Sequence, residues 1–148
     1  MALAVLANNL PSLEEVFKSI ILAALKANLY GAISENALKS NGKIQDIELR
    51  KYFGNNEDDH EYFLMDIPEK EWSEQSYEHG TFRKDGKPLF LLAGTDNVPS
   101  RVCYDFSLAY LRLCPEHLIG IYDWIFTLED IEKIEQETGW FERWYQNR

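Results

Sequence analysis

The run Asp58-Asp59-His60-Glu61 contains the residue types in this chain that best suit a metal ion. Carboxylates and an imidazole are ligands for Mg²⁺, Mn²⁺ or Zn²⁺. Adjacent residues cannot all point at one ion, so at most two of the four could bind it, and other ligands would have to come from elsewhere. The pattern therefore favours a solvated acidic loop, and we expect neither a metal ion nor another cofactor.

Cys103 and His117 form the best nucleophile–base pair in the sequence, with Asp105 or Asp123 available to orient the imidazole. The two would meet if the segments that carry them were paired strands. The competing interpretation, which we favour, makes Cys103 a small core residue and His117 an exposed turn residue. Cys114, which precedes a proline, is also expected to be structural.

The motifs of the common enzyme classes are missing. The sequence contains no G-x-S-x-G, P-loop, G-x-G-x-x-G, H-E-x-x-H or C-x-x-C. An enzyme is therefore the alternative hypothesis: a metal-assisted hydrolase using residues 58–61, or a thiol enzyme using Cys103. A small-molecule pocket between sheet and helix, lined by Tyr104, Phe106 and Trp124, is a third interpretation.

The segment from Glu57 to Glu78 concentrates the negative charge of the chain. It contains nine acidic residues and a single base, Lys70, whereas the whole chain has a net charge of −10. Aromatic side chains lie among the acids and are suited to anchoring a partner. The residues expected to contact that partner are Glu57, Asp58, Asp59, Glu61, Tyr62, Glu69, Glu71, Trp72, Glu74 and Tyr77.

This charge narrows the classes of partner. A net negative field repels phosphate backbones and anionic membrane surfaces, so we expect neither nucleic acid nor a membrane. The same field attracts a basic protein surface and speeds encounter with it. We therefore expect a small acidic protein-binding module, of the inhibitor or immunity type, that engages a basic partner through residues 57–78.

A second aromatic group lies near the end of the chain, at Trp140, Phe141, Trp144 and Tyr145. Large amphipathic rings suit a docking surface, so a homo-oligomer could form through them. The same rings could equally cover one end of a sheet. The sequence leaves the two alternatives open.

Length and composition indicate one globular domain over residues 1–148. An apolar fraction of 45% is too high for a disordered chain. The apolar stretch from Met1 to Leu10 has no preceding Lys or Arg, unlike a signal peptide, and no apolar run is long enough to span a bilayer. With only two cysteines, a cytoplasmic protein is the expectation.

Three elements carry strong local signals. Ser12 and Glu15 form a capping box before a helix predicted to end near Tyr30-Gly31. Thr127 caps a second helix that Gly139 ends or kinks. Asp85-Gly86 predicts the turn of a β-hairpin within residues 81–92, because both central residues of a type I′ turn need a positive φ.

The remaining elements are predicted from weaker patterns. Residues 2–7 suggest a short helical turn, residues 44–53 a short helix, and residues 62–67 a strand. The segment 102–113 fits both helix and strand, and strand is preferred for its aromatics. Residues 118–126 predict one further strand. The fold class is α+β, with N-terminal helices, an antiparallel sheet of about four strands and a C-terminal helix.

Overall fold

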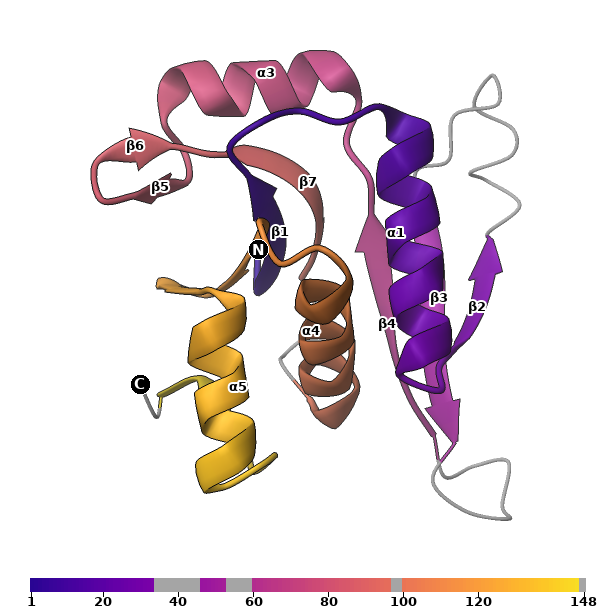
Figure 1. Ribbon diagram of the computed structural model, residues 1–148. Coiled ribbons are helices and arrows are strands. Elements are labelled where there is room, and N and C mark those ends of the chain that lie inside the picture. Colours follow the sequence, from indigo (N-terminus) through magenta and orange to yellow (C-terminus); the bar gives the residue numbers. More distant parts are fainter. Residues whose placement is uncertain (34–45, 53–59, 97–99, 147–148) are drawn as a thin grey trace.

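A computed structural model describes residues 1–33, 46–52, 60–96 and 100–146 of the chain (Figure 1). A single antiparallel sheet of seven strands runs in the order β2-β3-β4-β7-β1-β8-β9. The α+β class is confirmed, but the sheet is larger than the four strands expected and helices are interleaved with it. The strands are β1 (Leu3–Ala7), β2 (Tyr30–Ile33), β3 (Asp46–Tyr52), β4 (His60–Asp66), β7 (Phe90–Thr95), β8 (Leu118–Ile121) and β9 (Trp124–Phe126).

Four α-helices lie in the described residues: α1 (Leu13–Lys26), α3 (Lys70–His79), α4 (Arg101–Leu113) and α5 (Leu128–Glu137). A small hairpin of β5 (Arg83–Lys84) and β6 (Lys87–Pro88) has Asp85 and Gly86 at positive φ, as its sequence predicted. None of the helices in these ranges has the length and apolar character needed to cross a bilayer.

Strand β1 lies between β7 and β8, and all five of its residues are buried. Leu3, Val5 and Ala7 join the large core under the helices, whereas Ala4 and Leu6 belong to a smaller cluster on the other side. The prediction of a helical turn here was wrong. A strand covered on both faces is apolar at every position, so it shows no period-two alternation.

A β-bulge shapes the pairing of β1 with β7. Val5 pairs with Ala93 but Leu6 pairs with Leu91, so Leu92 is the extra residue. Leu92 and Ala93 both pack in the larger core, while Leu91 packs in the smaller one. The bulge thus explains why two consecutive residues of β7, Leu92 and Ala93, pack in the same core.

Two helical crossovers place α1 and α4 on the same face of the sheet. Strand β1 leads through α1 to β2, and β7 leads through α4 to β8. All neighbouring strands in the sheet are antiparallel, and an odd number of strands lies between the two members of each pair. Strand β1 is therefore parallel to β2, and β7 is parallel to β8. The two crossovers run in opposite directions along the sheet from oppositely directed strands. The right-handed rule then puts both helices on one face, and Figure 1 shows them there beside α5.

Helix α1 begins as its sequence predicted. The Ser12 hydroxyl accepts a hydrogen bond from the backbone N–H of Glu15, and Val16, Ile20, Ala23 and Ala24 form the buried side. The helix ends earlier than expected, at Ala27, because Asn28 turns the chain with φ 59°. Gly31, the predicted cap, instead lies in β2 opposite Leu49.

Residues 101–113 form helix α4, so the strand preferred for this segment was wrong. Val102, Tyr104, Phe106, Leu108 and Tyr110 alternate with other residues, which mimics a strand. Every one of them is nevertheless buried in the helix. The less buried positions Arg101, Asp105, Ala109 and Arg112 follow the spacing of one helix face, and the apolar alternation over residues 102–110 obscures that period in the sequence.

Residues 46–52 form β3, so the short helix predicted there was wrong. Ile47 and Leu49 are fully buried. Glu48 and Arg50, which alternate with them, are partly exposed and form an ion pair with each other on the opposite face. This is the period of two expected for a strand with one face on the core. The predicted strand at 62–67 is confirmed as part of β4, which pairs with β3 along its full length.

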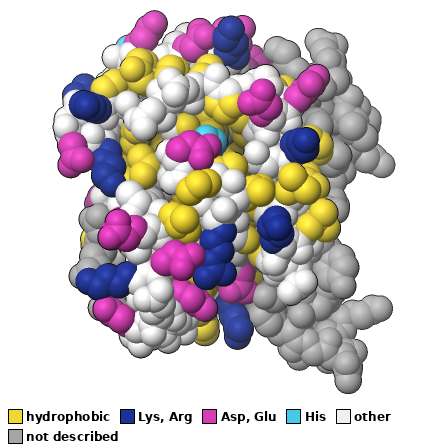
Figure 2. All heavy atoms as spheres, in the orientation of Figure 1, with side chains coloured by type: hydrophobic (Ala, Val, Ile, Leu, Met, Phe, Trp, Pro, Cys, Tyr) yellow, Lys and Arg dark blue, Asp and Glu magenta, His cyan; other side chains and the backbone are white. Residues whose placement is uncertain are grey.

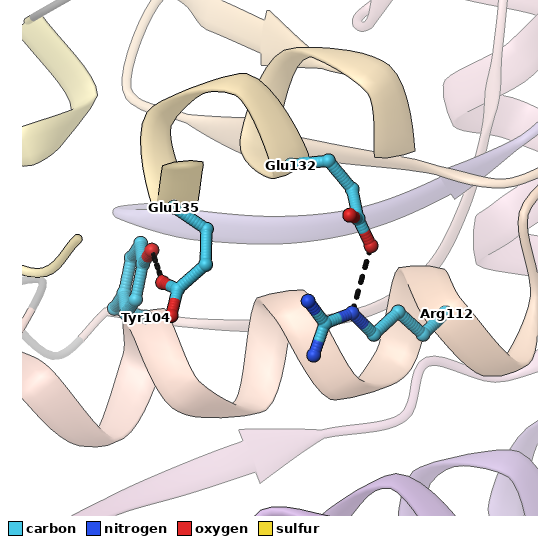
Figure 3. Close-up of polar contacts among 4 residues, drawn as sticks. All are labelled: Tyr104, Arg112, Glu132 and Glu135. Carbon is cyan, nitrogen blue, oxygen red and sulfur yellow. Dashed lines mark hydrogen bonds and ion pairs between the residues drawn. The ribbon is translucent and has the colours of Figure 1, made fainter. Parts of the chain in front are cut away.

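The predicted C-terminal helix is confirmed as α5, with a capping box between Thr127 and Asp130. The single strand expected at 118–126 is instead a hairpin of β8 and β9, which turns at Tyr122 with φ 50°. Two polar contacts join α5 to α4 (Figure 3). Arg112 Nε donates to Glu132 at 2.7 Å, and the Tyr104 hydroxyl donates to Glu135.

The C-terminal aromatic residues take unequal positions. Trp144, in a short 3₁₀ turn (Trp144–Gln146), is 1% exposed and lies 4.9 Å from the ring of Tyr104 and 5.3 Å from that of Phe126. Trp140 is 40% exposed, and Arg101 lies over its ring. Trp144 therefore covers one end of the core, whereas Trp140 remains on the surface.

This difference makes Trp144 and Trp140 a matched pair for a stability test. We expect Trp144→Ala to lower the free energy of unfolding by about 3–5 kcal/mol, because it opens a cavity in the core. Trp140→Ala should change it by about 0.5 kcal/mol or less. Urea denaturation followed by circular dichroism measures both, and equal losses would contradict the placement of Trp144 in the core.

Candidate functional site

Helix α3 and its N-cap residue together carry half of the predicted contact residues, although no hydrophobic stripe marks a helix in this part of the sequence. The chain leaves β4 at Pro68, and Glu69 occupies the N-cap position. Gly80 ends the helix with φ 62°, where its N–H bonds the carbonyls of Ser76 and Tyr77. The inward side is small and polar, so the hydrophobic stripe that usually predicts a helix is missing.

The inward side of α3 is held against β7 at a place where the sheet opens. Strands β4 and β7 pair only at Asp66 opposite Gly94 in the described residues. The buried Ser73 hydroxyl donates to the carbonyl of Leu91 at 2.8 Å. Tyr77 stacks on Phe90 with ring centroids 4.0 Å apart. These contacts fix which side of α3 faces outward.

The outward side of α3 presents a row of acidic side chains. Glu71, Glu74 and Glu78 are exposed and follow the i, i+3, i+7 spacing of one helix face. Lys70 approaches Glu74 at 3.8 Å, but both side chains are solvated and the pair is weak. In Figure 2, acidic side chains lie along the upper edge of the molecule, over α3, and others are spread over the rest of this face.

Two hollows flank the start of α3. The larger, of about 480 Å³, lies between the beginning of α1 and the beginning of α3, with Leu10, Leu13 and Ile67 in its apolar wall and Glu69 and Glu71 at its acidic side. The smaller, of about 340 Å³, is lined by Trp72, Leu91 and Asp66, among others. Pro68 and Glu69 line both, so the link from β4 to α3 separates them.

The structure brings together one part of the predicted contact set. Helix α3 and its N-cap hold Glu69, Glu71, Trp72, Glu74 and Tyr77. Of these, Tyr77 turns partly inward onto Phe90.

The other contact residues lie upstream. Glu61 and Tyr62 lie in β4, opposite Lys51 and Arg50 in backbone register. Glu57, Asp58 and Asp59 lie outside the described residues. Part of the possible metal-binding segment 58–61 therefore lies outside the described residues.

Cys103 is a core residue, as we favoured over its pairing with His117, but His117 is mostly buried and not exposed as expected. Cys103 is buried near the start of α4, and His117 follows the end of that helix. The backbone rises by roughly 15 Å along the α-helix from Cys103 to Leu113. Of the two expected orienting groups, Asp105 lies 3.9 Å from Arg101, and Asp123 lies in the turn between β8 and β9.

The thiol that lies beside His117 is that of Cys114, which the sequence had assigned a structural role. Cys114 Sγ, a Glu116 carboxylate oxygen and a His117 ring nitrogen all lie within 4.8 Å of one another. The Tyr110 hydroxyl lies 2.8 Å from His117 Nδ1. Burial lowers the pKa of His117, which keeps its imidazole neutral, and burial raises the pKa of Tyr110, which keeps its phenol protonated.

The three residues of the third interpretation, a small-molecule pocket between helix and sheet, pack in or against the core. Tyr104 and Phe106 are buried in the main core, and Trp124 packs against that core. Burial, followed by the hydrogen bond to Glu135, raises the pKa of Tyr104. These aromatics therefore stabilise the fold by packing in its core.

The attachment of α3 can be tested through Ser73. We expect Ser73→Ala to lower the free energy of unfolding by about 1–3 kcal/mol, because the buried carbonyl of Leu91 loses its partner. Amide exchange in α3 should speed up in the same variant. Gln75→Ala, on the exposed side of α3, is the control and should leave both unchanged. Identical behaviour of the two variants would show that Ser73 does not hold the helix.

Within the part of the chain that the structure describes, two arrangements thus carry chemistry beyond packing: the acidic side of α3 with its hollows, and the group Cys114, Glu116 and His117 after α4. Comparison of the chain with protein-family models, curated proteins and solved structures gives no match.

Proposed function

We propose that this protein is a small acidic protein-binding module, of the inhibitor or immunity type, whose α3 engages a basic surface of a partner protein. The observation that carries the proposal is the exposed row of Glu71, Glu74 and Glu78 on a helix whose opposite side is fixed to the sheet. A rigid helix presents these carboxylates without a large ordering cost on binding.

The charge supplies the first step of recognition. The chain carries a net charge of −10, and Glu71, Glu74 and Glu78 place three exposed carboxylates on one side of α3. Such a field steers a basic partner toward the helix and raises the association rate, an effect that falls as salt rises. The same field works against nucleic acid and anionic lipid as occupants.

Trp72 supplies the anchor beside this row. Its side chain is 47% exposed, on α3, and it lines the smaller hollow. Exposed tryptophans that can become fully desolvated are frequent centres of binding energy. The larger hollow adds an apolar wall, from Leu10 and Leu13, next to the carboxylates of Glu69 and Glu71. That combination fits a long basic side chain, whose stem is apolar and whose end is charged.

A charge-matched comparison tests the proposal. The variant Glu71→Gln, Glu74→Gln, Glu78→Gln removes the α3 row, and the control Glu129→Gln, Glu137→Gln, Glu142→Gln removes three exposed acids at and after α5. Both have the same net charge. In pull-downs from lysate of the source cells, read by mass spectrometry, we expect a stoichiometric partner that is captured about tenfold less by the first variant only.

The salt dependence of capture tests the electrostatic role, and a Trp72 variant separately tests the anchoring role. Capture by the unmodified chain should fall between low and moderate salt, and Trp72→Ala should speed dissociation of the complex at either salt. Equal loss in the two triple variants would attribute binding to the overall field instead of α3. A partner retained equally at both salts would contradict the electrostatic role.

A further inference from the structure

The side chains of Cys114, Glu116 and His117 lie at distances that fit a single metal ion. Their ligand atoms lie within 4.8 Å of one another, and His117 Nε2 lies 3.5 Å from Glu116 Oε1. Around a tetrahedral zinc ion with bonds of about 2.0–2.3 Å, ligand atoms are separated by roughly 3.3–3.8 Å. The nitrogen–oxygen pair already has this spacing.

A tight turn explains why these three residues converge. The N–H of His117 donates to the carbonyl of Cys114 at 3.0 Å, which closes a β-turn with Pro115 at its second position. Proline favours that position because its ring fixes φ. The first and fourth residues of such a turn lie within about 7 Å at their Cα atoms, so their side chains can meet. The N–H of Cys114 also bonds the carbonyl of Tyr110, which ties the turn to α4.

The surroundings orient the imidazole. The hydroxyl of the buried Tyr110 lies 2.8 Å from Nδ1 of His117, so this ring nitrogen is engaged and Nε2 is directed toward Glu116. Metal-binding histidines are typically held in this way through the nitrogen that does not bind the metal. The turn is therefore held by α4 on one side and by its own hydrogen bond on the other.

Burial leaves the group accessible from one side. Cys114 is 8% exposed and the His117 side chain 15%, whereas the Glu116 side chain is 71% exposed. An ion could thus enter past Glu116 and meet a sheltered sulfur and nitrogen. We propose that Cys114, Glu116 and His117 form a Zn²⁺ site, with a water molecule as the fourth ligand.

The ligand types select the metal. A thiolate with an imidazole and a carboxylate suits Zn²⁺, whereas Mg²⁺ and Ca²⁺ prefer oxygen ligands alone. This site is separate in sequence and in chemistry from the acidic side of α3, and the binding of zinc here does not depend on the partner-binding function.

The direct test is a Zn²⁺ titration of the reduced, full-length chain, after chelation, against a chromophoric competitor. We expect a single ion per chain with the unmodified protein. Cys114→Ser and His117→Gln should each weaken binding about 100-fold or more, and Tyr110→Phe by about 10–100-fold through loss of the orienting hydroxyl. Cys103→Ala and His79→Gln change the same residue types elsewhere and should leave the affinity unchanged.

Cobalt supplies a spectroscopic reading that a purely structural role would not produce. Bound Co²⁺ should give intense tetrahedral bands and a sulfur-to-cobalt charge-transfer band that Cys114→Ser abolishes. Glu116→Gln, at an exposed position, should fold normally and still weaken the site, which keeps the test valid if a variant of a buried residue does not fold. No zinc binding, equal loss in the control variants, or bound cobalt without the charge-transfer band would each overturn the proposal.

Discussion

The burial of β1 on both faces is the constraint on which the rest of this structure depends. Its five residues contact the helical layer on one side and a smaller cluster on the other. Because β1 lies between β7 and β8, α4 must cross over it to connect them, and α1 must leave from its end. The two crossovers then build the helical layer, and α5 joins it through Arg112–Glu132 and Tyr104–Glu135.

The same arrangement leaves one place where the sheet is incomplete, and α3 occupies it. Strand β4 ends at Asp66, and Ser73 of α3 donates a hydrogen bond to the carbonyl of Leu91 in β7. The acidic residues of α3 therefore project outward as a consequence of how the sheet opens. The cluster of Cys114, Glu116 and His117 also follows from the path of the chain, because the chain turns sharply at Pro115 before it enters β8.

The elements predicted correctly were those with strong local signals. Ser12 and Thr127 cap their helices through hydrogen bonds to residues three positions away, and Asp85-Gly86 forms its turn by its own backbone preference. The elements predicted wrongly were those whose pattern is set by their surroundings. Residues 3–7 are buried on both faces and so show no period of two, whereas residues 102–113 combine a helical spacing with an apolar alternation that mimics a strand.

The sequence by itself determined the α+β class, the caps, the hairpin turn and the acidic segment, because these follow from neighbouring residues and composition. Only the tertiary structure decided which acids share one face of α3, because the small, polar inward side of that helix matches a gap in the sheet. It likewise decided that His117 meets Cys114 and not Cys103. The length of a helix separates Cys103 from His117, whereas a four-residue turn brings Cys114 beside it.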